Sequence, residues 1–207
     1  MHGGPALHIE DLDLFAPEQL GVNNLVTIRK GEMVYLPLSK VPHQADHEFV
    51  KIQGRGGEWS CTFFDRLSST CTVYDKRPVA CRLLKCWDTE DILNISGKRL
   101  LSRFDIIEDA DPMLAFIRHH EKVCPIPPLN DILVRLNSSE QRDRTLEELE
   151  KLVNMDMRLR ILAARENSLT MPQELFYLGR PVFQLLVPMG ITYKETPAGL
   201  SLYFDNL

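Results

Sequence analysis

The sequence predicts a mixed α+β protein, with a small antiparallel β portion that carries the cysteines, helices packed with it, and a C-terminal helical extension closed by a hairpin. Three observations lead to this fold class: short β runs lie before residue 75, helical apolar periodicity dominates residues 78–190, and a β-rich segment turns at Pro197-Ala198-Gly199. We expect a cysteine domain, residues 1–129, and a helical extension with the terminal hairpin, residues 130–207.

The first forty residues predict a short helix followed by a hairpin. Gly3-Gly4-Pro5 is typical of a turn, and Asp11 or Asp13 can begin a short helix. Residues 25–38 contain two short β runs joined through Lys30-Gly31-Glu32, so we predict that these two runs pair with each other.

Two segments before the cysteines have both a structural and a functional interpretation. His43 and His47 would share a face of a helix and could bind a metal together, but Pro42 and the polar surroundings favour a solvated turn. Gly54-Arg55-Gly56-Gly57 lacks the Lys-Ser or Lys-Thr of a phosphate-binding loop. We therefore predict a tight turn there, leading into a strand at residues 58–64.

The segment from Trp59 to Trp87 places four of the five thiols among positive charges. The four thiols belong to Cys61, Cys71, Cys81 and Cys86. Arg77, Arg82 and Lys85 are interleaved with them, and positive charge lowers the pKa of a thiol and offsets the charge of a tetrathiolate site. We predict that these cysteines ligate a metal. Buried or redox-sensitive thiols and disulfides are the alternatives.

The local structure predicted for this segment brings three of the thiols together. Cys61 on the first strand and Cys71 at the start of a second β run would face each other across a hairpin. Asp75-Lys76-Arg77-Pro78 is typical of a helix start, so Cys81 would lie in the first turn, where the helix dipole favours a thiolate. Cys86 reaches the same centre only if that helix ends early.

Composition and charge limit the cellular locations and the classes of binding partner that we expect. The net charge of −5 and the isoelectric point near 5.7 disfavour nucleic-acid and anionic-membrane partners. The chain has neither an apolar run of membrane-spanning length nor the pattern of a secretory signal, so we expect a cytoplasmic protein. Five cysteines in a reducing compartment favour ligation or redox chemistry over a disulfide framework.

The second half of the chain is predicted to be mainly helical. A helical pattern over residues 88–120 is broken at Asp111-Pro112, and we interpret His119-His120 as surface residues because adjacent residues on a helix do not converge. Cys124 is either a fifth ligand or a lone buried thiol, and we favour the latter. A longer helix over residues 138–169 and a shorter one from residue 171 to about 190, with prolines as kink or stop signals, precede the hairpin.

The cysteine segment resembles the CxxCxxCC family of YkgJ-type cysteine-cluster proteins, which are described as zinc- or iron-chelating. The matching positions are Cys61, Cys71, Val73, Tyr74, Arg77, Pro78, Cys81 and Arg82. The resemblance implies metal or iron–sulfur binding, with some relatives linked to protein methylation, and it implies no settled reaction. The family's first cysteine block would precede Gly3-Gly4-Pro5 and has no counterpart here, so we expect either that Met1 is not the natural start or that this member lacks half of the thiols.

Two hypotheses of different classes follow. In the first, a cytoplasmic protein holds an iron–sulfur cluster or zinc through Cys61, Cys71, Cys81 and Cys86, with Arg77 and Arg82 tuning the site and Tyr74 shielding it. In the second, the chain is a non-catalytic interaction module with structural zinc or metal-free buried cysteines, and its helices at residues 139–190 bind a protein partner. An enzyme with a nucleophilic cysteine ranks third because no cysteine is paired with a recognisable His and Asp or Asn set.

Overall fold

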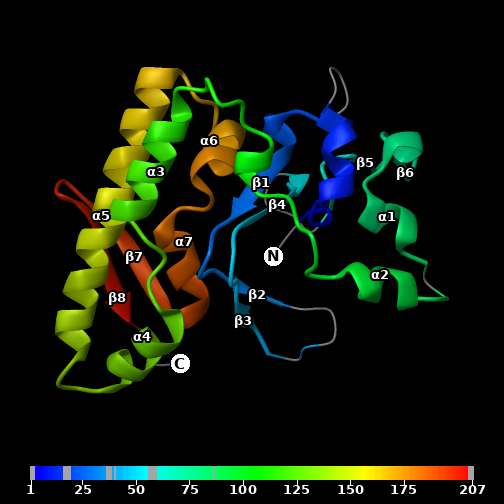
Figure 1. The fold of residues 1–207 in the computed structure, drawn as a ribbon. Helices are drawn as coiled ribbons and strands as arrows, with labels where there is room; N and C mark the ends of the chain where they lie inside the picture. Colours follow the sequence, from blue (N-terminus) through cyan, green and yellow to red (C-terminus); the bar gives the residue numbers. More distant parts are fainter. Residues whose placement is uncertain are drawn as a thin grey trace.

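The mixed α+β fold class is confirmed by the computed structural model. It describes residues 3–15, 20–35, 39, 41–55, 60–85 and 87–204. Short antiparallel strand pairs occupy the first part of the chain, and helices follow until the last strand pair. Figure 1 shows the long helix α5 (Arg142–Asn167) on one side of the molecule and the small helices α1 (Val79–Leu83) and α2 (Glu90–Ile95) on the opposite side.

The predicted N-terminal helix is present as the 3-10 helix η1 (Ile9–Phe15), and it is tied to helix α1 by a buried carboxylate. Asp11 is fully buried and accepts hydrogen bonds from the backbone nitrogens of His8 (3.0 Å) and Val79 (2.8 Å). Because Val79 is the first residue of α1, Asp11 binds an otherwise unsatisfied donor at the helix start. This contact fixes the position of the helix that carries Cys81.

The predicted hairpin over residues 25–38 is wrong in its pairing. Strand β1 (Leu25–Ile28) pairs with β4 (Phe49–Ile52), whereas β2 (Met33–Val34) pairs with β3 (His43–Gln44). The turn itself forms, with Gly31 at a positive φ of 91°. Beyond it the buried carboxylate of Glu32 accepts a hydrogen bond from the Arg29 backbone nitrogen and binds Arg180, which directs the chain away from β1.

The strand predicted at residues 58–64 is not continuous where the structure describes it: Phe64 lies in a strand and Cys61 forms an isolated bridge with Gly54, but residues 62 and 63 form a turn. The chain forms a turn at Cys61, where the backbone nitrogen of Phe64 donates to the Cys61 carbonyl oxygen (3.0 Å). The strands that follow, β5 (Phe64–Asp65) and β6 (Thr70–Cys71), are shorter than predicted. The loop between them closes on the Asp65 carboxylate, which accepts hydrogen bonds from the backbone nitrogens of the next residues.

Helix α1 starts directly after Pro78, as predicted, and it ends early, at Leu83. An early end was the condition for Cys86 to reach the same centre as the other thiols. Cys86 itself lies outside the described residues. Among the described residues, the other 3-10 helices are η2 (Val22–Asn24), η4 (Tyr74–Lys76), η5 (Arg103–Asp105) and η6 (Val187–Met189). The remaining α-helices are α3 (Met113–Val123), α4 (Leu129–Asn137), α6 (Met171–Leu178) and α7 (Val182–Leu186).

The helix predicted from residue 171 to about 190 is two helices. Gly179, with φ of 70°, ends α6, and Pro181 precedes α7, so the proline acts as a stop signal and not as a kink. The terminal hairpin is confirmed as β7 (Ile191–Thr196) paired with β8 (Gly199–Phe204).

No helix among the described residues combines the length and apolar composition that crossing a membrane requires.

Two main hydrophobic clusters hold these elements together. One joins α4, α5 and α7 with the terminal hairpin. The other joins the N-terminal segment with β1 and β4, and it also contains Phe176 of α6, whose carbonyl oxygen accepts a hydrogen bond from Thr27 of β1 (2.5 Å). Residues on both sides of the predicted boundary at 129/130 therefore share one cluster, and the division into two domains stays a prediction.

Candidate metal centres

Three of the four predicted ligands lie in one region of the molecule. Cys61 comes from the turn before β5, Cys71 from β6 and Cys81 from α1, and each is partly buried and free of disulfide bonds. Cys61 packs against the cluster that contains β1 and β4. A Cβ atom added to Gly4 would lie 3.0 Å from Cys61 Sγ, so the absence of a side chain there gives the sulfur its space.

The three thiols influence one another electrostatically. Burial raises the pKa of Cys61, and the neighbouring Cys71 raises it further. Burial also raises the pKa of Cys81 to about 11, with added contributions from Cys61, Cys71 and Asp11, while Arg77 acts in the opposite direction. The expectation that positive charge and the helix start favour a thiolate at Cys81 is therefore wrong for the metal-free protein. Desolvation and neighbouring negative charge outweigh the single arginine.

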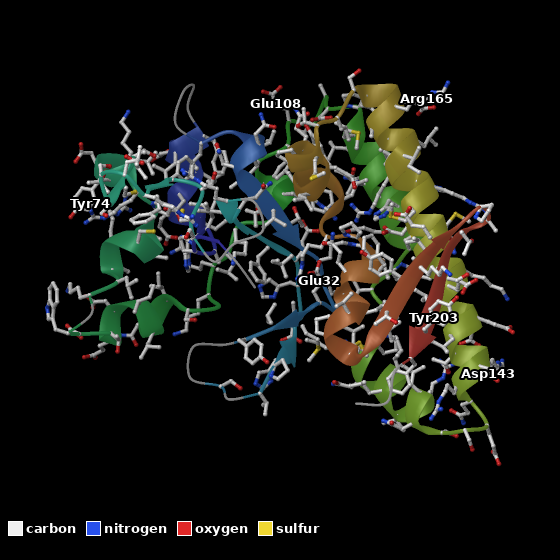
Figure 2. All side chains as sticks on the ribbon, turned by 180° about the vertical axis from the view of Figure 1, so that it is seen from behind. Glu32, Tyr74, Glu108, Asp143, Arg165 and Tyr203 are labelled. Carbon is white, nitrogen blue, oxygen red and sulfur yellow. The ribbon has the colours of Figure 1, made fainter. Side chains whose placement is uncertain are left out.

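The residues predicted to tune and shield the site occupy its outer side. The Arg77 guanidinium carbon lies 3.8 Å from the centre of the Tyr74 ring, and the buried Nε of Arg77 has no hydrogen-bond partner. Arg82 is exposed and donates to the Arg77 carbonyl oxygen (3.2 Å). Figure 2 shows Tyr74 at the edge of the molecule that lies opposite the terminal hairpin with Tyr203. Of the two arginines predicted to tune the site, Arg77 is thus the one that acts on the Cys81 thiol, and the Tyr74 ring lies against its guanidinium.

The thiols of Cys61, Cys71 and Cys81 are not gathered around a single point. In the part of the chain that the structure describes, one group of three or more His, Cys, Asp or Glu side chains has its ligand atoms within 4.8 Å of one another, and it contains none of these three cysteines. Ligands of one zinc ion must lie that close. Among the described residues, the thiols of Cys61, Cys71 and Cys81 alone therefore do not form such a closely spaced set.

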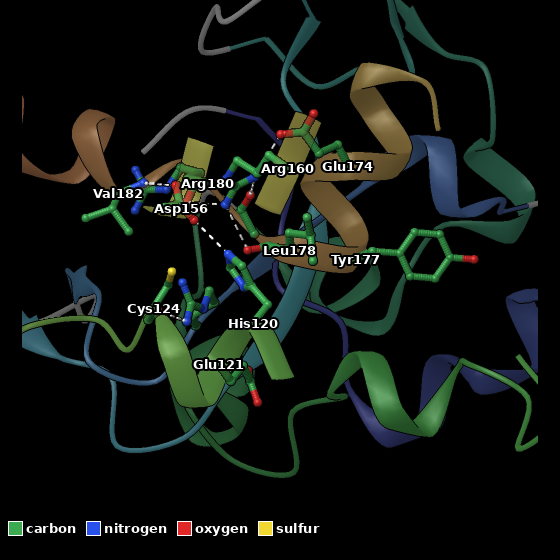
Figure 3. Close-up of polar contacts among 12 residues, drawn as sticks. His120, Glu121, Cys124, Asp156, Arg160, Glu174, Tyr177, Leu178, Arg180 and Val182 are labelled. Atoms are coloured by element: carbon green, nitrogen blue, oxygen red, sulfur yellow. Dashed lines mark hydrogen bonds and ion pairs between the residues drawn. The ribbon is translucent and has the colours of Figure 1, made fainter. Parts of the chain in front are cut away.

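The group with close ligand atoms consists of His120, Cys124 and Asp156, and all three side chains are fully buried. His120 and Cys124 lie at the end of α3, and Asp156 lies on α5 (Figure 3). His120 Nε2 is 2.7 Å from Asp156 Oδ1. The other carboxylate oxygen, Oδ2, accepts hydrogen bonds from Arg160 Nε (2.9 Å) and from the Val182 backbone nitrogen (3.0 Å).

This group corrects two of the sequence-based interpretations. His119 is exposed as expected, but His120 is not a surface residue, and Cys124 is buried as expected but does not lie alone. Adjacent residues are about 100° apart on a helix, so only one of two histidines can face the core. The helical spacing of Met113, Ile117, His120 and Cys124 marks the buried face of α3 and would have placed His120 and Cys124 in the core.

Burial and hydrogen bonding set the protonation states at this second group. Burial lowers the pKa of His120, although its bond to Asp156 acts in the opposite direction, so the imidazole is neutral at pH 7. For Asp156, burial opposes ionisation, but the hydrogen bond from His120, the charge of Arg160 and the Val182 nitrogen outweigh it and lower its pKa. Because an ionised carboxylate only accepts, Nε2 of His120 carries the ring hydrogen, and Nδ1 is buried without a partner.

A buried ionic network extends from this group toward the β strands. Arg160 also binds the carboxylate of Glu174 (2.9 Å) and the carbonyl oxygens of Leu178, Gly179 and Arg180 (3.0–3.1 Å). Arg103, fully buried, binds Glu48 (2.9 Å) and Glu121. Glu48 and Glu121 both line an open cleft of about 680 Å³. Desolvation raises the pKa of Glu48 to about 7, which Arg103 only partly opposes.

Glu48→Gln is expected to remove a pH dependence of stability. The folded protein holds a proton on Glu48 that the unfolded chain releases near pH 4.5, so this group makes the protein less stable as the pH rises toward 8. The loss is on the order of 2 kcal/mol. His120 acts in the opposite direction because its pKa is lowered, and it does so in both proteins. Urea unfolding at pH 5, 6, 7 and 8 checks the difference between the two profiles.

Glu108→Gln is the matched control because Glu108 is an exposed carboxylate (Figure 2). Its stability profile should run parallel to that of the unmodified protein. If the Glu48→Gln profile were also parallel, Glu48 would not carry the extra proton in the folded state.

Comparison of the chain with models of protein families, with curated proteins and with solved structures gave no match. The resemblance of the cysteine segment to the CxxCxxCC family therefore stays a prediction, and the functional assignment depends on the residues themselves.

Proposed function

We propose that this chain is a metal-binding protein that holds an iron–sulfur cluster through Cys61, Cys71 and Cys81, with Cys86 as the fourth thiolate. One observation carries the proposal: three free, partly buried thiols come from separate segments, and Cys71 raises the cost of ionising Cys61, while Cys61 and Cys71 both raise that of Cys81. Without a cation the thiols of Cys61 and Cys81 stay protonated, and a bound cation would stabilise the thiolates because its positive charge offsets their mutual repulsion. Zinc is the alternative occupant.

The neighbouring residues support this chemistry. Arg77 is the positive group that acts on Cys81, and it would offset part of the charge of the thiolates. Arg82 donates a hydrogen bond to the Arg77 carbonyl oxygen, and the Tyr74 ring covers one side of the Arg77 guanidinium. A cytoplasmic location belongs to the same proposal, since a reducing compartment keeps the thiols available for ligation.

Anaerobic reconstitution with iron and sulfide is the direct test. The protein is expected to turn brown, to absorb between about 400 and 450 nm and to contain iron and acid-labile sulfide in equal amounts. Cys71→Ser and Cys81→Ser should each reduce this absorption at least several-fold, and Cys124→Ser, which removes the buried thiol on α3, should keep it. Loading should be tighter at pH 8.5 than at pH 6.5 because ligation releases thiol protons.

A colourless product without iron would overturn the iron–sulfur form of the proposal. Zinc retained in that product and lost in Cys71→Ser would establish the alternative occupant. The absence of both metals from the thiols would overturn the proposal as a whole.

A second candidate function is a protein-interaction module, and the exposed apolar side chains around the cysteines favour it. Leu67, Leu84 and Trp87 are 99%, 60% and 85% exposed. Exposed apolar side chains of this size are typical of protein-binding surfaces when they lie together. In this function the metal only supports the fold, so Cys81→Ser would unfold the cysteine segment. If the cluster instead has a redox role, Cys81→Ser would lose the cluster while the protein stays folded.

A further inference from the structure

The geometry points to a second metal site in this protein, and we propose that His120, Cys124 and Asp156 bind one zinc-class divalent cation that links α3 to α5. This site is separate from the thiols of Cys61, Cys71 and Cys81, and it does not depend on the function proposed for them. Its ligand atoms, a ring nitrogen, a sulfur and a carboxylate oxygen, lie within 4.8 Å of one another.

The donor set matches the chemistry of zinc. Zinc binds imidazole nitrogen, thiolate sulfur and carboxylate oxygen, and sites of three protein ligands leave a fourth position open. Harder cations such as magnesium and calcium prefer oxygen ligands only, so a nitrogen and a sulfur select against them. His120 lies in the last turn of the eleven-residue helix α3 and Cys124 is its C-cap, and the helix dipole favours a positive charge at this end.

The cation takes the place of the hydrogen between His120 Nε2 and Asp156 Oδ1. These atoms are now 2.7 Å apart and would separate to roughly 3.4 Å around a tetrahedral ion. The ring hydrogen moves to Nδ1, which is unpartnered, and the Cys124 thiol loses its proton to solvent. One proton is therefore released for each ion that binds.

Positive charges beside the site are matched by negative ones. Arg160 contacts Asp156, but it also binds Glu174. Arg29 is almost fully buried and donates to the Cys124 carbonyl oxygen (2.6 Å), and the charges of Glu121 and Glu32 act on it in the direction opposite to that of Arg103. Two charged ligands, the Cys124 thiolate and the Asp156 carboxylate, then balance the two charges of the ion.

Complete burial of the ligands means that the ion enters while the chain folds. The experiment therefore uses refolding. In the full chain with Cys61, Cys71, Cys81 and Cys86 all replaced by serine, Cys124 is the only remaining thiol. Refolding this variant with cobalt(II), which reports thiolate ligation by near-ultraviolet charge-transfer absorption, is expected to give one bound equivalent and that absorption.

Two further variants, made in the same background in which Cys124 is the one remaining thiol, identify the ligands. Adding Cys124→Ser should abolish the charge-transfer absorption, and adding His120→Asn should reduce the bound cobalt at least ten-fold. Circular dichroism shows which variants fold. A folded parent variant that binds no cobalt, or cobalt retained with its absorption after Cys124→Ser, would overturn the site. Neither result bears on the iron–sulfur proposal, because all of its thiols are absent from this background.

Discussion

Arg160→Met is expected to lower the free energy of unfolding by about 3–5 kcal/mol. Arg160 is 1% exposed, and its guanidinium binds Asp156, Glu174 and the carbonyl oxygens at the end of α6 and just after it. Methionine fills a similar volume but leaves the buried Asp156 carboxylate and those carbonyl oxygens without this donor. Equilibrium unfolding in urea at pH 7 measures the change.

Arg144→Met provides the control for this prediction. Arg144 lies on the same helix, and its side chain is 82% exposed and pairs with Glu148 (3.1 Å). Surface pairs of this kind contribute between about 0 and 1 kcal/mol, so the control should lose little stability. Similar losses for the two variants would show that burial of the Arg160 network is not the source of its effect.

Phe176→Ala is expected to cost about 3–5 kcal/mol and to expose a cysteine. Phe176 is fully buried in the cluster that β1 and β4 form, and its ring packs edge-on against Tyr177 at a centroid distance of 5.1 Å. Removing the ring leaves a cavity between α6 and these strands. Because Cys61 packs against the same cluster, its reaction with a thiol reagent should become faster along with the loss of stability.

Met171→Ala is the matched control on α6, since Met171 is 77% exposed. It should change stability by less than about 0.5 kcal/mol and leave the thiol reaction unchanged. If Phe176→Ala destabilised the protein without any change at Cys61, the two parts of the chain would unfold independently, which would support the division predicted at residues 129/130.

Local sequence signals predicted a helix or hairpin well when its formation depends mainly on the residues within it. The long helix α5 follows from an apolar stripe in an otherwise charged segment, the start of α1 from Pro78, and the terminal hairpin from its turn. The strand partners of β1 and β2 were not predictable in this way. Glu32 decides them through Arg180, a residue 148 positions later in the chain.

The two candidate metal sites differ in the same way: local signals could predict the first but not the second. The thiols of Cys61, Cys71 and Cys81 lie close together in the sequence, so hairpin and helix signals sufficed to bring them into one region. The raised pKa values of Cys61 and Cys81 were not foreseen, because desolvation depends on what covers each sulfur. Asp156, the residue that completes the second site, had no signal of its own beside the many charges of α5.

By itself the sequence determined the α+β class, most helices and the segment in which the clustered thiols lie, because periodicity, turn residues and spacing act over short stretches of chain. Only the tertiary structure decided that His120 faces the core, that Asp156 meets it from another helix, and that Arg29 and Arg160 are buried beside them. Buried charges must find partners wherever the fold brings them, and those partners are separated by up to 148 residues.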